Sequence, residues 1–251
     1  MKVIGVIPAR FESTRLPHKL LKELCGKPLL QWSYEAAKRA RLLDTLIIAC
    51  DDKRIKDAAA AFNAPCVMTS PEHKSGTDRI AEAVSAIDAK IVINIQADEP
   101  LIDPLVIDRL AQEMLADDKL MMATAKCKIT APEEINNPNV VKVVCDKNGY
   151  ALYFSRHAIP YLRDKDFMPH YYKHLGIYAY TKDFLYVFKK LSGSMLEAAE
   201  KLEQLRVLEA GYKIKMIEVE QESVGVDTQE DFNRVEAIIK ERSRGDSRIA
   251  R

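Results

Sequence analysis

The segment from Pro8 to Lys19 contains residue types suited to binding a phosphate chain. Arg10, Arg15 and Lys19 supply positive charge, and Ser13 adds a hydroxyl. A triphosphate needs several fixed cations and donors around it, and arginine binds phosphate oxygens in a planar, bidentate way. The segment lacks the glycine patterns of a dinucleotide fingerprint or a P-loop. It is therefore either a side-chain phosphate site or a solvated basic loop.

Two carboxylates lie where they could hold a metal ion. Asp98 follows an apolar strand in the run NIQADEP, and Asp227 precedes the last predicted helix. Hard cations such as Mg²⁺ prefer oxygen ligands and are often bound against substrate phosphates. A turn or helix-cap role is the alternative for Asp98. Thr228 and Asp231 resemble a capping box, which leaves Asp227 available as a ligand.

A third polar segment, Ser75 to Arg79, opens a predicted helix. Helix N-termini present free amides to anions and to the polar edges of ligands. Serine, threonine and aspartate are also the preferred capping residues. The segment therefore predicts either a ligand-binding helix start or a plain cap.

Apolar strands alternate with helical patterns through the first half of the chain, and this order positions the polar loops. The pattern predicts an α/β fold with a doubly wound, mostly parallel, Rossmann-like sheet. Its strands are apolar throughout, as expected when both faces of a sheet are covered. Ligands bind such sheets at the carboxyl ends of the strands. The predicted strands are Val3–Ile7, Thr45–Cys50, Cys66–Thr69 and Lys90–Ile95, and the helices are Leu29–Ala40, Lys53–Phe62, Asp78–Ile87 and Pro104–Leu115.

The second half is richer in strands. Asn148-Gly149 indicates a hairpin turn. A single amphipathic helix is predicted over Glu197–Glu209, with Gly211 as its C-terminal cap. The predicted strands are Met121–Lys128, Val140–Cys145, Ala151–Ser155, Tyr172–Tyr180 and Ile214–Val219, and the last helix is Thr228–Lys240.

The composition excludes several classes of protein. A net charge of +1 over 251 residues gives no sign of a nucleic-acid or membrane partner. The sequence has no signal-peptide layout and no apolar run of about 18 residues, so we expect a cytoplasmic protein without a membrane span. The five cysteines form no CxxC pair, and their spacing indicates no thiolate metal site. Cys50, Cys66, Cys127 and Cys145 lie in or beside apolar runs and are predicted to be reduced core residues.

Nine segments in order resemble the CMP-Kdo synthetases, the cytidylyltransferases that activate the sugar acid Kdo (3-deoxy-manno-octulosonate). The resemblance runs from about Val3 to Ile238, and SGTDR with LEQLR distinguishes this family from other nucleotidyltransferases. It implies a nucleotide-diphospho-sugar transferase-like fold and a Mg²⁺-dependent transfer of CMP from CTP to Kdo for lipopolysaccharide biosynthesis. The segments are IPARFESTRLPHK, GKPLLQW, MTSPEHKSGTDRIAEA, NIQADEPLI, NPNVVKVV, ALYFSRHAIPY, HLGIYAY, LEQLRVLEAG and GVDTQEDFNRVE.

The resemblance also implies roles for individual residues. The catalytic residues would be Arg10, Lys19 and Asp98, and the Mg²⁺ ligands would be Asp98 and Asp227. The nucleotide would be bound by Ala9, Arg10, Ser13, Arg15, Lys19, Ser75, Thr77, Arg79 and Gln96. The sugar acid would be bound by Gln96, His174, Tyr178, Glu203 and Gln204.

The same resemblance suggests how the chain is organised. We expect one nucleotidyltransferase domain over residues 1–251, with a CTP-binding portion (1–120), a sugar-binding and dimerisation portion (121–240) and a frayed tail (241–251). Aromatic residues are enriched at interface cores, and the segment Ala151–Tyr180 is dense in them, so we expect a β-rich dimerisation extension and a homodimer. The aromatic residues are Tyr153, Phe154, Tyr161, Phe167, Tyr171, Tyr172, Tyr178 and Tyr180.

Three positions depart from the family pattern. Ala97 and His18 replace usual glycines, and Leu20 replaces a usual proline. Glycine permits a positive φ or a close backbone approach, so Ala97 and His18 test whether the two loops keep their geometry. Two other functions remain open, a CMP-sialic acid synthetase-like transferase and a non-catalytic nucleotide-binding protein.

Overall fold

A computed structural model describes residues 2–164, 166, 169–220 and 223–249, with side chains described as far as Arg242. The chain divides into two compact units. The first takes residues 1–89, 94–107 and 223–251, and the second takes residues 90–93 and 108–222. The chain passes from one unit to the other within β6 (Ile91–Asn94) and α4 (Pro104–Ala116). The C-terminal segment therefore belongs with the first strands of the chain.

The first unit is built on three parallel strands, β1 (Val3–Ala9), β4 (Thr45–Cys50) and β5 (Cys66–Met68). Nearly all of β1 and β4 is buried, which explains their continuous apolar sequence. A Cβ atom on Gly5 would lie 2.8 Å from Leu46 Cδ1 and 2.9 Å from Leu43 Cδ1, so a larger residue there would make these leucine side chains shift. The other elements of the unit are α1 (Leu29–Ala37), α2 (Lys53–Ala61), α3 (Gly76–Ala83), α9 (Gln229–Ile249), the 3-10 helix η1 (Lys19–Leu21) and the small pair β2 (Glu23–Leu24) and β3 (Lys27–Pro28).

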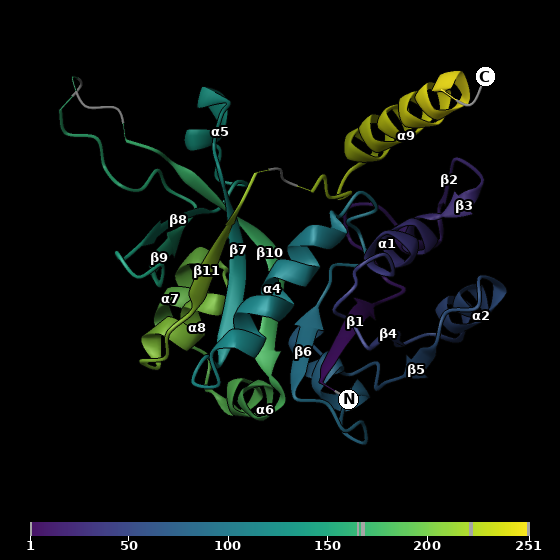
Figure 1. Cartoon of the computed structure of the whole chain (residues 1–251), viewed down its shortest axis with the longest axis horizontal. Helices are drawn as coiled ribbons and strands as arrows, with labels where there is room; N and C mark the ends of the chain where they lie inside the picture. Colours follow the sequence, from purple (N-terminus) through teal and green to yellow (C-terminus); the bar gives the residue numbers. More distant parts are fainter. Residues whose placement is uncertain (1, 165, 167–168, 221–222, 250–251) are drawn as a thin grey trace. The chain divides into compact units, whose positions relative to one another are not determined.

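The strands of the second unit centre on β7 (Met122–Lys128). The strand β11 (Lys215–Val219) pairs with it in parallel, and β10 (Tyr172–Thr181) pairs with it antiparallel (Figure 1). The strands β8 (Lys142–Cys145) and β9 (Ala151–Ser155) form the predicted hairpin, with Gly149 at φ +78° in its turn. Mixed, mostly parallel pairing with flanking helices confirms the predicted α/β fold class.

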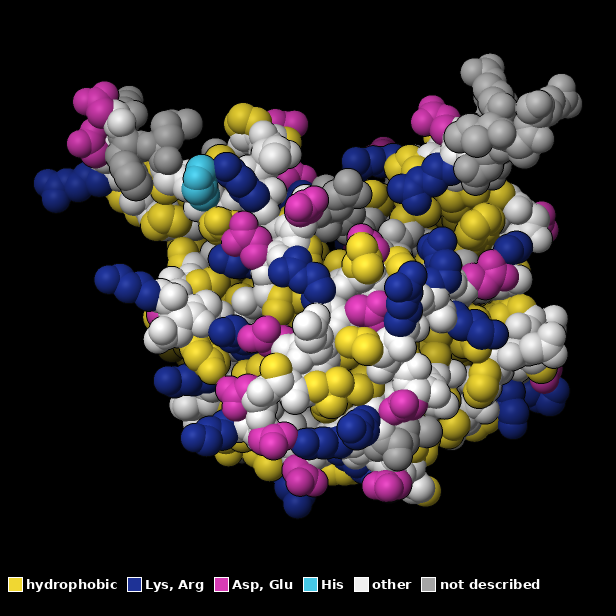
Figure 2. Space-filling model, viewed as in Figure 1, with side chains coloured by type: hydrophobic (Ala, Val, Ile, Leu, Met, Phe, Trp, Pro, Cys, Tyr) yellow, Lys and Arg dark blue, Asp and Glu magenta, His cyan; other side chains and the backbone are white. Residues whose placement is uncertain are grey.

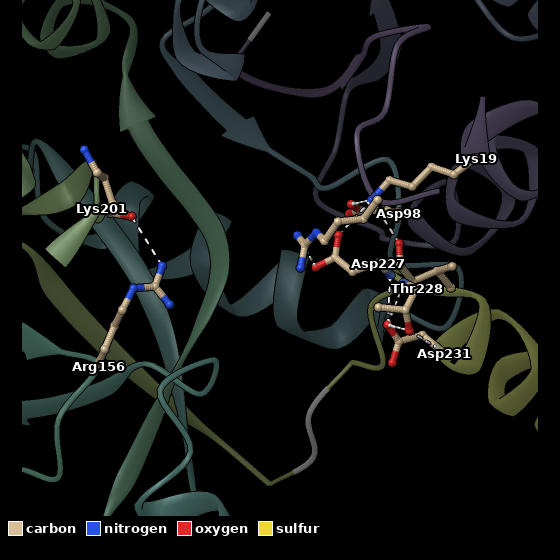
Figure 3. Close-up of polar contacts among 9 residues, drawn as sticks. Lys19, Asp98, Arg156, Lys201, Asp227, Thr228 and Asp231 are labelled. Carbon is tan, nitrogen blue, oxygen red and sulfur yellow. Dashed lines mark hydrogen bonds and ion pairs between the residues drawn. The ribbon is translucent and has the colours of Figure 1, made fainter. Parts of the chain in front are cut away.

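The single helix predicted over Glu197–Glu209 is wrong. The structure has two helices there, α7 (Met195–Glu200) and α8 (Gln204–Glu209), separated by Lys201 in the left-handed region at φ 55°. The Arg156 side chain donates to the carbonyls of Glu200 at 2.7 Å and Lys201 at 3.4 Å (Figure 3). These carbonyls are at the helix end, where backbone acceptors lack helical partners. Gly211, at φ +83°, follows α8 as predicted, and the unit also contains α5 (Pro132–Ile135) and α6 (Lys182–Lys190).

The last helix is longer than predicted. The helix α9 continues to Ile249, past the predicted end at Lys240, so the tail expected to fray is helical over residues 241–249. Val235 and Ile239 are buried on one face of this helix and anchor its first turns. Adding residues to an existing helix costs much less free energy than nucleating a new one. The polar end of the chain can therefore continue the helix.

The surface carries charges of both signs (Figure 2), and the cysteines form no disulfide. On the face shown in Figure 2, basic and acidic side chains are intermingled. All five cysteines are free; Cys50 and Cys127 are buried, whereas Cys66 and Cys145 are only partly so. Among the described residues, no helix has the length and apolar character needed to cross a membrane.

Lys142 is a fully buried lysine in the hairpin of the second unit. Its ammonium donates three hydrogen bonds, to the carbonyl oxygens of Asn137 at 2.9 Å, Val140 at 2.7 Å and Arg156 at 2.5 Å. Burial lowers the pKa of this lysine. Three donors thus meet three acceptors, and the side chain joins the segments on both sides of the hairpin.

We predict that Lys142→Met lowers the free energy of unfolding by about 3 kcal/mol, because three backbone carbonyls lose a charged donor. Chemical denaturation followed by circular dichroism measures the change. Lys147→Met, at an exposed position of the same hairpin, is the matched control and should stay within about 0.5 kcal/mol of the wild type. Equal stability of the two variants would contradict the structural role.

Candidate active site

A polar cavity of about 400 Å³ lies in the first unit, at the ends of its strands. It gathers most of the residues predicted to bind nucleotide or metal. Ala9 and Thr77 are the exceptions, because both side chains are buried in the packing of β1 and α3. The predicted residues that line the cavity are Arg10, Ser13, Arg15, Lys19, Ser75, Arg79, Gln96, Asp98 and Asp227.

The ammonium of Lys19 connects the first loop to both predicted metal ligands. Its Nζ atom lies 2.6 Å from Asp98 Oδ2 and 3.0 Å from Asp227 Oδ1 (Figure 3). It also donates to the Val226 carbonyl at 2.9 Å. Burial lowers the Lys19 pKa, but the charge of Asp98 and the hydrogen bonds to both carboxylates outweigh it, so the pKa is raised overall. Lys19 is therefore a permanent cation between two carboxylates.

Asp227 is fixed in place by the start of α9. The Asp231 carboxylate accepts hydrogen bonds from the backbone amides of Asp227 at 3.1 Å and Thr228 at 2.8 Å, and the Thr228 hydroxyl accepts from the Asp231 amide (Figure 3). This confirms the predicted capping pair. The Val226 amide donates to the Asp98 carbonyl at 2.8 Å, which ties this loop to the Asp98 loop. The two carboxylates are thus brought together by backbone contacts as well as by Lys19.

The carboxylate pair has the composition expected of a binding site for a hard divalent cation. No group of three or more His, Cys, Asp or Glu side chains able to hold a metal occurs in the described part of the chain. Two carboxylates without a third protein ligand suit Mg²⁺, which keeps several waters and is usually bound by one or two carboxylates plus substrate phosphates. Burial, followed by the charge of Asp98, raises the pKa of the adjacent Glu99 to about 7.

The start of α3 combines a cap with a buried arginine. Ser75 caps the helix by accepting from the Asp78 amide at 3.1 Å, so its capping role is real. Arg79 is buried and donates to Thr69 Oγ1 at 2.7 Å and to Asp51 Oδ2 at 3.0 Å. Asp51 also accepts from the Phe11 amide at 2.9 Å. One carboxylate therefore orients both the first loop and the arginine that lines the cavity.

Sequence reasoning missed three residues of this site. Asp51 follows the strand Thr45–Cys50, so the rule that selected Asp98 at a strand end could have selected it too. His73 and Lys74 line the cavity immediately before the Ser75 cap. The His73 Nε2 atom contacts the Glu82 carboxylate, which also accepts from the Ser70 amide at 3.1 Å. Both residues belong to the MTSPEHKSGTDRIAEA segment, and their position before a helix start was the available signal.

The two glycine replacements behave differently. Ala97 is buried, its carbonyl accepts from Ser33 Oγ at 2.8 Å, and its φ lies outside the left-handed region, so alanine fits there. His18 does adopt the left-handed region, with φ 53° and ψ 31°, immediately before Lys19. This conformation normally favours glycine, although histidine is one of the residues that tolerate it best.

A three-layer stack holds His18 in its strained conformation. Its ring stacks on Phe11 with a centroid distance of 4.1 Å. The Arg54 guanidinium lies 3.5 Å from the Phe11 ring centre. Both contacts are face-on, so Phe11 is enclosed between histidine and arginine. Asp52 in turn binds Arg54 Nε at 2.8 Å and Nη2 at 2.6 Å, and the Arg54 hydrogen bonds lower the pKa of Asp52 to about 2.

In the second unit, His174 and Tyr178 lie close together on β10. His174 Nε2 is 2.9 Å from Thr124 Oγ1, and this hydroxyl is 2.7 Å from the Ile177 carbonyl. Since the hydroxyl must donate to the carbonyl, it accepts from Nε2–H, which leaves Nδ1 as an acceptor. The ring packs against Phe154 at 4.9 Å and Tyr178 at 5.4 Å. Burial lowers the pKa of His174 to about 3, so the ring is neutral.

The other predicted sugar residues of this unit occupy the start of α8. Gln204 is buried, and Glu203 precedes it without forming a cap. Burial raises the pKa of Tyr178, and the negative charge of Glu203 raises it further. Four predicted sugar residues thus belong to the second unit, whereas Gln96 belongs to the first.

The fold and the cavity define a nucleotidyltransferase, an α/β protein with cationic side chains and a carboxylate pair at the ends of parallel strands. The cytidylyltransferase family profile matches residues 4–215. The chain belongs to this family of cytidylyltransferases.

Relatives of known name agree with the family assignment. The chain is 50% identical over 239 residues to the 3-deoxy-manno-octulosonate cytidylyltransferase of Solibacter usitatus, covering 95% of each protein. It is 49% identical over 241 residues to the protein of the same name from Chloroherpeton thalassium, covering 95% of this chain and 98% of the relative. A solved structure of CMP:2-keto-3-deoxy-manno-octonic acid synthetase complexed with CTP superposes with a TM-score of 0.93 at 42% identity, covering 96% of this chain and all of that one.

We predict that the His18–Phe11 stack contributes about 0.5–1.5 kcal/mol to stability, the range of such ring pairs. A double-mutant cycle with His18→Ala and Phe11→Leu, followed by chemical denaturation, measures this coupling. His18→Gly should be nearly neutral, because it loses the stack but relieves roughly 1 kcal/mol of backbone strain. Strictly additive effects of His18→Ala and Phe11→Leu would show that the stack is incidental.

We also predict that His174 makes the protein less stable as pH falls. Its folded pKa of about 3 lies below the unfolded value near 6.5, so the unfolded state binds the extra proton between these values. Stability is complete above about pH 6.5 and should drop by about 1–2 kcal/mol between pH 7 and pH 5. His174→Gln should flatten this part of the pH profile, while His170→Gln, at an exposed position, should leave it unchanged. Parallel profiles for wild type and His174→Gln would refute the assignment.

Proposed function

We propose that this protein transfers CMP from CTP to Kdo, producing CMP-Kdo and pyrophosphate, a step that activates Kdo for lipopolysaccharide biosynthesis. The observation that carries this proposal is the Lys19 ammonium between Asp98 and Asp227 in a cavity lined by arginines. Relatives about half identical to this chain over nearly their full length are named for this activity. A non-catalytic nucleotide-binding protein would have no need for the carboxylate pair.

The nucleotide half of the reaction belongs to the first unit. Arg10, Arg15 and Lys19 supply the positive charge that would bind the CTP phosphates and stabilise the departing pyrophosphate. Arg15 Nη2 lies 2.9 Å from Asp227 Oδ2, so this arginine is already oriented toward the carboxylates. Ser75 and Arg79 would contact the cytidine from the start of α3.

The carboxylate pair fits a magnesium ion. Both carboxylates lie within hydrogen-bonding distance of a single cation, Lys19, and a divalent ion would compete with it for the same oxygens. Asp98 and Asp227 would hold the ion, with water and phosphate oxygens completing its coordination. When bound, Mg²⁺ neutralises charge on the phosphates and favours ionisation of the attacking hydroxyl.

The sugar half would use residues of the second unit. Kdo is rich in hydroxyl groups, and neutral His174 offers Nδ1 as an acceptor for one of them. Tyr178 stays protonated because burial and the Glu203 charge raise its pKa, so it can donate. Glu203 accepts and Gln204 does both. A site built to form such bonds rejects sugars that leave a buried partner unpaired.

In the transfer itself, the anomeric oxygen of Kdo attacks the α-phosphorus of CTP in line with the leaving pyrophosphate. The new bond joins that oxygen to phosphorus, and the bond to the β-phosphate oxygen breaks. The hydroxyl proton is lost to solvent, while Arg10 and Lys19 balance the charge that develops on pyrophosphate. Catalysis here depends on alignment and charge neutralisation rather than on a covalent enzyme intermediate.

The decisive experiment measures pyrophosphate release from CTP with and without Kdo. We predict Kdo-dependent release, a preference for CTP over ATP and GTP of about 100-fold, and near-complete loss in Asp98→Asn with the fold retained. Asp103→Asn, an exposed carboxylate in the same connection, is the control and should keep full activity. Release with sialic acid but not Kdo would favour the alternative transferase. Asp98→Asn at wild-type rate would remove the metal assignment.

We further propose that the protein forms a homodimer through the second unit. An apolar groove of about 690 Å³ lies between β7, the β9–β10 connection and α5, and Tyr161 beside it is 87% exposed. Phe154 and Tyr180, by contrast, are buried within the chain, and Phe167 lies outside the described residues. We predict twice the 28.4 kDa chain mass by light scattering at micromolar concentration, shifting toward monomer in Tyr161→Asp. A monomeric wild type would reject the dimer.

A further inference from the structure

Three sulfur atoms of the first unit lie close together, on residues that do not line the nucleotide cavity. Cys50 Sγ is 3.3 Å from Cys66 Sγ and 3.3 Å from Met68 Sδ. None of these residues lines the cavity or has a part in the proposed transfer. The sequence spacing gave no sign of the cluster, because strand pairing rather than a CxxC motif brings the sulfurs together.

The pairing of β4 with β5 places all three side chains on one face of the sheet. Cys50 pairs in register with Met68, and Cys66 is two residues before Met68 on the same strand. Side chains two residues apart on a strand point to the same face. Cys50 is fully buried, Cys66 is partly exposed and Met68 is 41% exposed. The cluster is therefore open to solvent on the β5 side and closed behind Cys50.

A disulfide is not the natural product of this arrangement. Cys66 pairs with Ile48, so it is diagonal to Cys50 across the two strands. Strand spacing and rise put the Cα atoms of such a diagonal pair about 8 Å apart. A disulfide requires Cα atoms closer than about 7 Å. Joining the two sulfurs directly would therefore require the strands to shift.

We propose that Cys50, Cys66 and Met68 form a binding site for a soft, monovalent metal cation of the Cu(I) class. Thiolate and thioether ligands together select Cu(I) over harder ions. Metal–thiolate bonds are about 2.3 Å long, so sulfurs 3.3 Å apart can both reach one ion at an angle of roughly 90°. Trigonal coordination places the sulfurs about 4 Å apart, so the cluster would open by roughly 0.7 Å on binding the ion.

The surroundings favour this ion over zinc. Structural zinc is held by four nitrogen, oxygen or thiolate sulfur ligands, and the described residues contain no cluster of three or more His, Cys, Asp or Glu side chains able to supply such a set. The hydrogen bond from Cys66 lowers the pKa of Cys50, which makes Cys50 the first to ionise. The same hydrogen bond, followed by burial, raises the pKa of Cys66, so the Cys66 thiol would lose its proton on binding the metal.

The test is a competition for Cu(I) between the reduced, full-length protein and the chromogenic chelator bicinchoninate under anaerobic conditions. We expect one Cu(I) ion per chain, confirmed by native mass spectrometry. Loss of an outer contact to a metal ligand costs 10–100-fold in affinity, so loss of a ligand in Cys66→Ser should weaken binding at least about 100-fold. Met68→Leu, which preserves shape and both thiols, should weaken it about 10-fold.

Matched controls make the outcome decisive. Cys145→Ser, on β8 of the other unit, should bind as tightly as the wild type, and thermal unfolding checks that Cys66→Ser and Met68→Leu are folded. Failure of the wild type to take copper from the chelator would overturn the proposal. It would also be overturned by Met68→Leu binding as tightly as wild type, by equal losses in Cys145→Ser and Cys66→Ser, or by tighter binding of Zn²⁺ than of Cu(I).

Discussion

The Lys19 ammonium between Asp98 and Asp227 is the interaction on which the first unit's cavity depends. Two carboxylates close together repel one another, and the cation between them removes that cost. Asp98 and Asp227 lie 79 and 208 positions after Lys19 along the chain. A single charge therefore joins the first loop, the end of β6 and the start of α9 into one site.

The loops that carry these charges are fixed mainly by side chains that bind backbone groups. Asp231 accepts from the Asp227 amide, and Ser33 donates to the Ala97 carbonyl, next to Asp98. In the first loop, the Phe11 amide donates to Asp51. Such bonds hold loop geometry without regular secondary structure. His18, immediately before Lys19, has a left-handed backbone conformation, which carries strain energy. Its stack on Phe11 offsets this strain within the same loop.

The sequence could predict those features that are determined by residues close by in the chain. The strands Thr45–Cys50 and Ala151–Ser155 were predicted with their observed bounds, since each is a short run of largely apolar residues bounded by polar residues. Asp98 was found because a carboxylate after a buried strand falls at the ligand-binding edge of a parallel sheet. The break at Lys201 could not be found, because Arg156, which binds the carbonyls there, lies 44 residues away from Glu200. Roles for His174 and Gln204 came from family resemblance alone, since burial on a strand or helix start has no local signature.

Lys142 and Lys19 show that the partners of a charge distinguish a functional site from a structural one. Lys142 donates only to backbone carbonyls, which are neutral and fixed by the hairpin, so nothing else can use them. Lys19 binds two carboxylates, whose negative charge would remain if the ammonium moved. A substrate carrying phosphates and a divalent cation offers exchange partners to both the lysine and the carboxylates. The same side chain is therefore a permanent brace in the second unit and an exchangeable counter-ion in the first.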